Sequence, residues 1–364
     1  MKYLIVSFCF MAWVPFLGHA QEPEQFRVQV LEVLDTYEEE LPGLDRTQEV
    51  QEVLVEVLNG SRSGDRIELT NDFFLSNPGD TFFVSALQAQ DGEYIYSIGE
   101  PDRRDILIFT VLGAIAAVIL LGGIQGARSL LALAGSIGVV VFILVPALLA
   151  GFSPLLVGVG VAIIILALVM GLTHGVSKTT LAAFIGTSAA VVVAGFLAAL
   201  VTETAGLSGF VSDEVVFLNL LTDGTLNLSG IFLTAVIIGM LGVLDDVAVT
   251  QAAAVRELLG TGLSVKETLV RSMRIGREHV GALVNTLALA YAGASLPLIL
   301  VFANTTQPLS LVLNREIFAA EIIRTAVGTI GIVLAVPLTT FIAVWLLTGK
   351  EKGKHPKPCG HTHV

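Results

Sequence analysis

The sequence predicts an α-helical polytopic membrane protein, with about seven transmembrane helices preceded by a small β-rich extracytoplasmic domain. Hydrophobic residues make up 54% of the chain and charged residues only 14%, whereas soluble domains carry about a quarter charged residues. The charges are also unevenly placed, because residues 22–105 hold 20 of the 32 Asp and Glu against six Arg. The chain after residue 105 is apolar with isolated charges, so two solvents, water and lipid, meet near this position.

The N-terminus is typical of a secretory signal peptide over residues 1–20. Lys2 supplies a positive start, residues 4–16 form a short apolar core, and Gly18 and Ala20 are small residues before a cleavage site. An uncleaved first helix is the alternative, although the apolar stretch is shorter than the ~20 residues that a span needs. Either reading exports the segment that follows, which we expect to form an extracytoplasmic acidic domain over residues 21–104.

Alternating apolar residues predict a β-rich fold for this domain. Strands are expected at 26–33, 51–58, 66–70, 81–87 and 93–98, with turns at 59–65 and 77–80. Such spacing is typical of a small barrel or sandwich. The two cysteines, Cys9 and Cys359, lie outside the domain, so an apolar core must hold it without a disulfide. Its net charge of about −14 argues against nucleic acid as a partner.

A transmembrane helical domain is expected over residues 105–349, followed by a basic, His-containing cytoplasmic tail at 350–364. Length and lack of charge predict spans at 106–123, 130–150, 154–172, 180–201, 230–250, 279–302 and 320–347. The connection 202–229 contains an apolar run, 215–221, that is too short to cross. Pro146, Pro297 and Pro337 are expected to kink their helices.

Basic residues predict the orientation of the spans. With the first domain outside, the inner segments hold 11 Lys and Arg, whereas the outer connections hold only Arg315. This asymmetry follows the positive-inside preference. The sequence therefore predicts a multi-pass protein of the cell membrane, with the N-terminal domain outside and the C-terminus in the cytoplasm.

Asp246, next to Asp245, is the most informative polar position in the predicted spans. It follows a charge-free run in the inner third of the fifth span, where an ionisable group is costly unless it is paired or hydrated and therefore indicates a function. The alternative is that the span ends at Leu244 and both carboxylates meet cytoplasmic water. Asn285 and Thr286 of the sixth span are expected at a similar depth, so a polar site between these two spans is a hypothesis.

Other polar groups lie nearer the membrane surfaces. His279 is a candidate for the same site or an interfacial anchor. Glu321 and Arg324, three residues apart, are expected either to neutralise each other or to snorkel to the membrane surface. Residues 266–277 form a basic amphipathic segment that we expect to lie on the inner leaflet. The tail residues His355, Cys359, His361 and His363 fit no standard metal site. No catalytic motif is present, so neither enzymatic activity nor a metal or cofactor is predicted.

Several long strings resemble the YibE/F-like family of multi-pass membrane proteins over nearly all of the chain after the signal. They are Leu241-Gly-Val-Leu-Asp-Asp246-Val-Ala, Gly276-Arg-Glu-His279-Val-Gly, the run from Asn285 to Pro297, and Glu321-Ile-Ile-Arg324 with Val336-Pro337. The resemblance implies that Asp246, His279, Asn285, Glu321 and Arg324 are the positions to consider. Asp245 and Glu278 depart from the family pattern. The resemblance implies an architecture and no activity.

Three functions are compatible with these observations. A permease or channel-like protein for a small solute or ion is the leading hypothesis, because buried polar groups and helix-breaking prolines occur together. The first alternative is a membrane-anchored interaction protein that recruits a partner through its outer domain. The second is an intramembrane aspartyl hydrolase, which would need a second carboxylate facing Asp246. The lipid bilayer is the one partner that every hypothesis includes.

Overall fold

The computed structural model describes residues 24–40, 47–88 and 94–348. The predicted signal peptide and the tail with its histidines lie outside the described residues. The chain divides into two compact units, residues 1–114 and residues 115–364.

The first unit contains one five-stranded antiparallel sheet, in the order β3-β2-β1-β4-β5. Its strands are β1 (Glu24–Glu40), β2 (Thr47–Val57), β3 (Arg66–Asn71), β4 (Thr81–Gln88) and β5 (Tyr94–Pro101). All five expected strands are confirmed. The described strands form a single sheet rather than the two sheets of a sandwich. We refer to residues 24–101 as the sheet domain.

The alternation that predicted the strands also builds the core of the sheet domain. Phe26, Val28 and Val30 of β1 are at most 1% exposed, and they face the buried Phe82 of β4 and the valines of β2. Alternate residues of a strand point to the same face, so one face of each strand is apolar. The ring of Phe74 packs edge-on against Phe82, with 5.4 Å between the ring centroids. This core holds the described part of the domain without a disulfide.

Strand β1 runs further than the sequence predicts and forms an acidic ribbon with β2. Pairing with β4 covers only Glu24–Gln29, whereas pairing with β2 continues to Glu40. Asp35 faces Glu52 across this ribbon, and Glu38 faces Glu49. Like charges directly opposite each other destabilise a strand pair. The acidic end of β1 was not expected as a strand because Asp and Glu have low β propensity.

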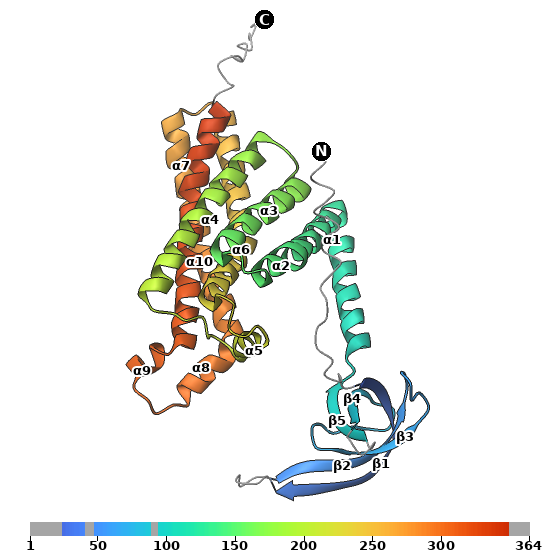
Figure 1. Cartoon of the computed structure of the whole chain (residues 1–364). Helices are drawn as coiled ribbons and strands as arrows, with labels where there is room; N and C mark the ends of the chain where they lie inside the picture. Colours follow the sequence, from blue (N-terminus) through green and yellow to red (C-terminus); the bar gives the residue numbers. More distant parts are fainter. Residues whose placement is uncertain (1–23, 41–46, 89–93, 349–364) are drawn as a thin grey trace, which may run out of the picture. The chain divides into compact units, whose positions relative to one another are not determined.

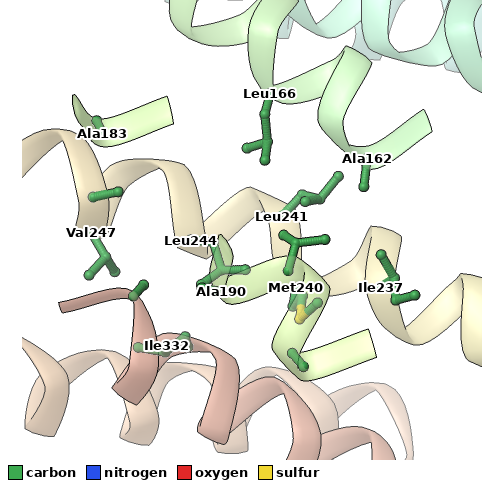
Figure 2. Close-up of a cluster of buried hydrophobic side chains, with 14 of the residues drawn as sticks. Ala162, Leu166, Ala183, Ala190, Ile237, Met240, Leu241, Leu244, Val247 and Ile332 are labelled. Carbon is green, nitrogen blue, oxygen red and sulfur yellow. The ribbon is translucent and has the colours of Figure 1, made fainter. Parts of the chain in front are cut away.

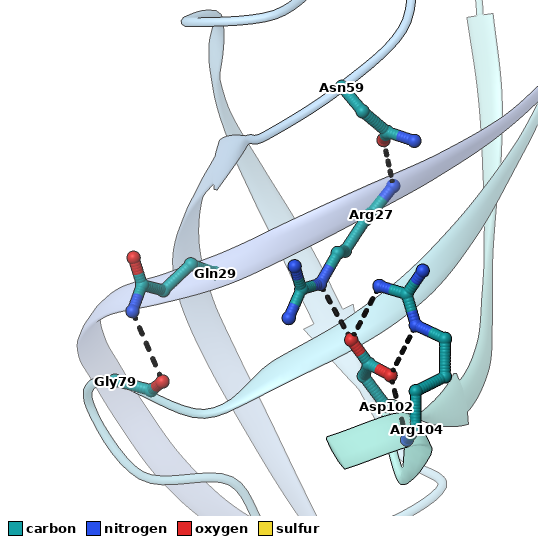
Figure 3. A network of polar contacts seen from close by, with 6 residues as sticks. All are labelled: Arg27, Gln29, Asn59, Gly79, Asp102 and Arg104. Atoms are coloured by element: carbon teal, nitrogen blue, oxygen red, sulfur yellow. Dashed lines mark hydrogen bonds and ion pairs between the residues drawn. The ribbon is translucent and has the colours of Figure 1, made fainter. Parts of the chain in front are cut away.

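Asp102 joins three elements of the first unit (Figure 3). Its carboxylate forms an ion pair with Arg27, whose Nε lies 2.6 Å from Oδ2, and accepts a hydrogen bond from Arg104 Nε at 2.8 Å; its side chain is 3% exposed. Arg104 is the first residue of α1 (Arg104–Val139), and its guanidinium lies 5.2 Å from the Phe83 ring centroid. The hydrogen bonds from Arg104, with the charge of Arg27, hold the pKa of Asp102 well below its usual range.

We expect Asp102→Asn to destabilise the sheet domain at neutral pH by about 1 kcal/mol, because charge-assisted hydrogen bonds are lost. A carboxyl whose pKa is lower in the folded state adds stability above its unfolded-state pKa of ~3.9 and loses it as the pH falls toward the folded-state value. The measurement is the urea concentration at which a protease begins to cleave the sheet domain. The difference in this concentration between the wild type and Asp102→Asn should therefore shrink below pH 4. An equal difference at pH 7 and pH 3 would contradict this role.

The rest of the described chain is helical (Figure 1). After α1 follow the π-helix η2 (Val140–Leu144), α2 (Val145–Leu149), α3 (Pro154–His174), α4 (Lys178–Thr204), α5 (Asp213–Leu221), α6 (Leu228–Gly260), α7 (Val265–Ala294), α8 (Leu296–Ala303), α9 (Leu309–Leu313) and α10 (Glu316–Thr348). Five helices are long and apolar enough to cross a membrane, or six if α7 and α8, which meet at 69°, form one span. The expected number was about seven.

The difference in number arises at Gly123. The spans expected at 106–123 and 130–150 belong to one helical stretch, Arg104–Leu149, which is interrupted where Gly123 has φ 57° and ψ −139°. Glycine adopts this conformation without the steric penalty of a Cβ atom. The chain turns so tightly there that a Cβ atom on Gly126 would meet the Val118 carbonyl group. The two apolar runs that the sequence showed are thus two helical segments that join at a sharp kink.

The basic segment 266–277 is not a separate helix on the inner leaflet, as expected, but the first part of α7. Ser264 caps this helix, with its hydroxyl and the Glu267 side chain forming a reciprocal capping box. The basic turns continue into the apolar turns as one helix, in spite of Gly276 and Gly281 between them. Thr268, Ser272 and Gly276 are buried along one face of this segment, so α7 is anchored by packing from its start.

Helices α4, α6 and α10 run side by side and form the centre of the membrane part (Figure 1). Figure 2 shows Met240 and Leu244 of α6 between Ala190 of α4 and Ile332 of α10, all of them fully buried. Small residues on α4 allow close approach, because a Cβ atom on Gly186 would lie 2.7 Å from Thr339 Cα. Gln251 of α6 crosslinks the bundle, with Nε2 donating to Ser272 O at 2.9 Å and to Thr340 Oγ1 at 2.7 Å.

Candidate functional site

A cavity of about 610 Å³ lies between α1, α3 and α6. Its wall consists of residues from the second half of α1, the start of η2, the second half of α3 and the middle of α6. They are Gln125, Ser129, Ala132, Leu133, Ser136, Ile137, Val140, Ile165, Leu166, Val169, Thr173, His174, Ile238, Leu241, Gly242, Asp245 and Asp246. We refer to this space as the aspartate cavity.

One end of the aspartate cavity is polar. Asp245 and Asp246 come from α6, His174 ends α3, and Gln125 lies on α1. Gln125 Nε2 donates to the Thr173 carbonyl oxygen at 2.9 Å and so ties α1 to the end of α3. Helix α3 ends here because the next residue, Gly175, has a positive φ of 71°.

The two carboxylates have no basic partner in the described part of the chain. None of the ion pairs there, at N–O distances up to 4.0 Å, includes Asp245 or Asp246. Asp245 is half-buried and Asp246 is exposed to the cavity. Both follow a charge-free run of α6, residues 228–244. Asp245 Oδ1 accepts a hydrogen bond from the backbone N–H of Asp246 at 3.0 Å. Two neighbouring carboxylates without an ion pair remain costly, so the stability of α6 does not explain these positions.

The structure brings Asp246 together with residues other than those expected. No lining residue of the aspartate cavity belongs to α7. Gln251, which contacts α7, lies five residues after Asp246 and therefore about 140° around α6. Asp246 faces away from α7, so the hypothesised site between the fifth and sixth spans does not form around it.

The α7 candidates His279, Asn285 and Thr286 do not line the aspartate cavity. The contact between Gln251 and Ser272 sets α6 and α7 antiparallel in a register that puts His279 level with Asp246. Asn285 is about 9 Å further along α7, at ~1.5 Å per residue. His279, Asn285 and Thr286 are all exposed, and the Thr286 hydroxyl donates to its own helix, to Ala282 O at 3.0 Å.

Glu321 and Arg324 form a second polar group at a different depth. Arg324 Nη1 lies 3.0 Å from Glu321 Oε1, which confirms the neutralising pair expected from their spacing. The Arg324 guanidinium lies 5.7 Å from the Phe232 ring centroid. Glu321 also lines a second cavity, of about 450 Å³, with Tyr291 and residues of α8 and α9. Because Thr340 pairs with Gln251, Glu321 is roughly 20 Å from the level of Asp246 along the bundle.

Sequence reasoning missed five polar residues of the aspartate cavity: Gln125, Ser129, Ser136, Thr173 and His174. It also set Asp245 aside. A signal was available, because the predicted topology puts the start of the second span, the end of the third and the inner third of the fifth at the same membrane surface. Shared depth does not reveal which helices are neighbours, and that information decides the site.

No curated protein and no solved structure matches the chain. The family model of the YibE/F-like proteins matches residues 110–349. The match confirms the family resemblance for the helical part. The sequence had led us to expect a resemblance over nearly all of the chain after the signal, but the match does not include the sheet domain. The matched segment contains the apolar helices, which identify a membrane protein. Since more than half of the chain is matched, the protein belongs to the YibE/F-like family.

Proposed function

We propose that the protein is a permease or channel-like protein that moves a small solute or ion across the cell membrane. The observation that carries this proposal is the aspartate cavity, where two carboxylates without a basic partner face an open space between apolar helices. Ionisable groups inside membrane segments mark substrate and ion pathways more often than structural sites. The proposal assigns no catalytic step to these groups.

The proposal uses a seven-span arrangement. The stretch Arg104–Leu149 has 46 residues and would be about 69 Å long, more than twice the ~30 Å of a bilayer core. Two crossings joined at Gly123 resolve this mismatch, and α7 with α8 supplies one bent crossing. An exported sheet domain then puts the C-terminus and the carboxylate end of the aspartate cavity on the cytoplasmic side, and Glu321 near the outer side.

Three irregular segments support a protein that changes shape. Gly123 breaks α1, a π-helix precedes Pro146, and α8 bends away from α7 next to Pro297. Irregular backbone is tolerated in membranes where it lines a cavity or lies within protein.

The test is flux in proteoliposomes loaded in turn with rubidium, with sodium, with a tetraalkylammonium cation, or with a pH-sensitive dye that reports protons. We expect the wild type to conduct at least one of them, and Asp246→Asn to lower that rate at least tenfold, because the variant removes a charge from the path. Glu257→Gln is the matched control, since Glu257 is an exposed carboxylate near the end of the same helix. Equal rates in all three proteins would refute the proposal.

A second function is recruitment of a partner by the sheet domain. The acidic ribbon favours it, because Asp35 opposite Glu52 and Glu38 opposite Glu49 destabilise the strands that carry them. A basic partner would relieve this repulsion. The flux comparison separates the two functions, since an anchor for a recruiting domain would conduct nothing in wild type or variant.

A further inference from the structure

We infer that the aspartate cavity takes an amphipathic organic cation, a molecule with one ammonium-like centre and an apolar body. The inference rests on the proposed function and specifies the class of its substrate. Three properties of the cavity support it: its size, the direction in which its walls change from polar to apolar, and its unbalanced charge.

The size of the cavity favours an organic molecule over a bare ion. Its volume of about 610 Å³ falls in the range of pockets for drug-sized ligands, ~300–1,000 Å³. A single water, which is comparable in size to a small inorganic ion, takes up only ~30 Å³. In the described residues, moreover, no three His, Cys, Asp or Glu side chains gather as metal ligands would. A desolvated metal ion would therefore find neither a fitted space nor enough ligands.

All three helices of the cavity change from polar to apolar in the same direction. On α1, Gln125 and Ser129 give way to Leu133, Ile137 and the η2 residue Val140. Helices α3 and α6 run antiparallel to this part of α1. Thr173 near the end of α3 therefore lies beside Gln125, where the cavity-lining segment of α1 begins.

On α3, the apolar Ile165, Leu166 and Val169 come before Thr173 and His174, and on α6 Ile238 and Leu241 come before Asp245. Ser136 is the exception, and its hydroxyl is occupied by Ala132 O of its own helix at 2.9 Å. The cavity therefore has a polar end and an apolar end, which is the shape of an amphipathic ligand.

The charge of the polar end selects the sign of the ligand. Asp245 and Asp246 are neighbours without an ion-pair partner within 4.0 Å in the described chain. Gln125 already donates to Thr173 O, which leaves its amide oxygen as an acceptor. A cation would balance the carboxylates, whereas an anion would be repelled and a neutral solute would leave them unpaired.

The test compares two probes of the same shape and opposite charge, tetraphenylphosphonium and tetraphenylborate, on the purified full-length protein in lipid nanodiscs. We expect saturable binding of the phosphonium and at least tenfold weaker binding of the borate. Asp245→Asn with Asp246→Asn should weaken phosphonium binding at least tenfold, and Asp245→Glu with Asp246→Glu should restore it to within a few-fold. Glu257→Gln, which alters a carboxylate outside the cavity, should bind as the wild type does.

Two results would overturn the inference: equal binding of the two probes, or equal phosphonium binding by the wild type and the double asparagine variant. The chromatographic profile of each variant shows whether it is folded, and the glutamate pair keeps the test valid if the asparagine pair is unstable. Flux of an inorganic ion that depends on Asp246, without phosphonium binding, would overturn this inference and leave the proposed function in place. Absence of both would refute both.

Discussion

Replacing Gly186 by leucine is expected to separate α4 from α10 and to be among the most destabilising single changes in the membrane part. A Cβ atom at this position would lie 2.7 Å from Thr339 Cα, so the obstacle is backbone, which no rotamer change relieves. Overpacking of a tight core costs up to about 3 kcal/mol, and occasionally more. We expect the apparent melting temperature of the detergent-solubilised protein to fall by about 6–12 °C.

Gly160→Leu is the matched control for this substitution. Gly160 lies within α3, and a Cβ atom there has no neighbour within 4 Å. It should leave the melting temperature unchanged or raise it slightly, because leucine favours helix more than glycine does. If Gly186→Leu and Gly160→Leu have the same melting temperature, α4 and α10 do not approach each other as closely as the structure describes.

Phe82→Ala is expected to unfold the sheet domain while the membrane helices stay folded. Phe82 is 0% exposed and packs against Phe74, and truncating a buried phenylalanine costs about 3–5 kcal/mol. A domain of about 80 residues has a total stability on the order of 4–12 kcal/mol. The loss is therefore a large share of what holds this domain. It should stay local, because the chain forms two compact units.

Limited proteolysis of the full-length protein in detergent measures this effect. The variant should be cleaved rapidly within residues 24–101, with the helical circular dichroism of the membrane part retained. Phe73→Ala is the control, since Phe73 is 66% exposed and its truncation should change stability by less than about 0.5 kcal/mol. Protection of the sheet domain in Phe82→Ala, or loss of helix signal along with it, would contradict the account.

The sequence predicted the parts of the fold that depend on local pattern. Alternation in residues such as Phe26, Val28 and Val30 located the strands, because one face of each strand is buried. The acidic end of β1 escaped prediction, since its pairing with β2 comes from the continuing register rather than from its own side chains. Gly123 is visible in the sequence, but a glycine alone does not reveal that its φ and ψ angles interrupt the helix.

The site was predicted in part for a similar reason. Asp246 stood out because a charge interrupts an apolar helix, and the Glu321–Arg324 pair followed from a spacing of three residues. The choice of α7 as the partner of Asp246 was wrong, because consecutive helices were assumed to share the site. The Asp246 side of α6 faces α1 and α3 instead, an arrangement that one sequence does not encode locally.

Thiol labelling in membrane vesicles tests most directly the central claim that α1, α3 and α6 enclose a water-accessible cavity with the carboxylates at one end. In a background with Cys9 and Cys359 replaced by serine, single cysteines are placed at Ser129, Asp246 and, as a lipid-facing control, Val192, which is 49% exposed on α4. A membrane-impermeant maleimide should label positions 129 and 246 from the cytoplasmic side only, and position 192 from neither side, because thiols react as hydrated thiolates. Labelling of 129 and 246 as slow as that of 192, or from the opposite side, would contradict the account.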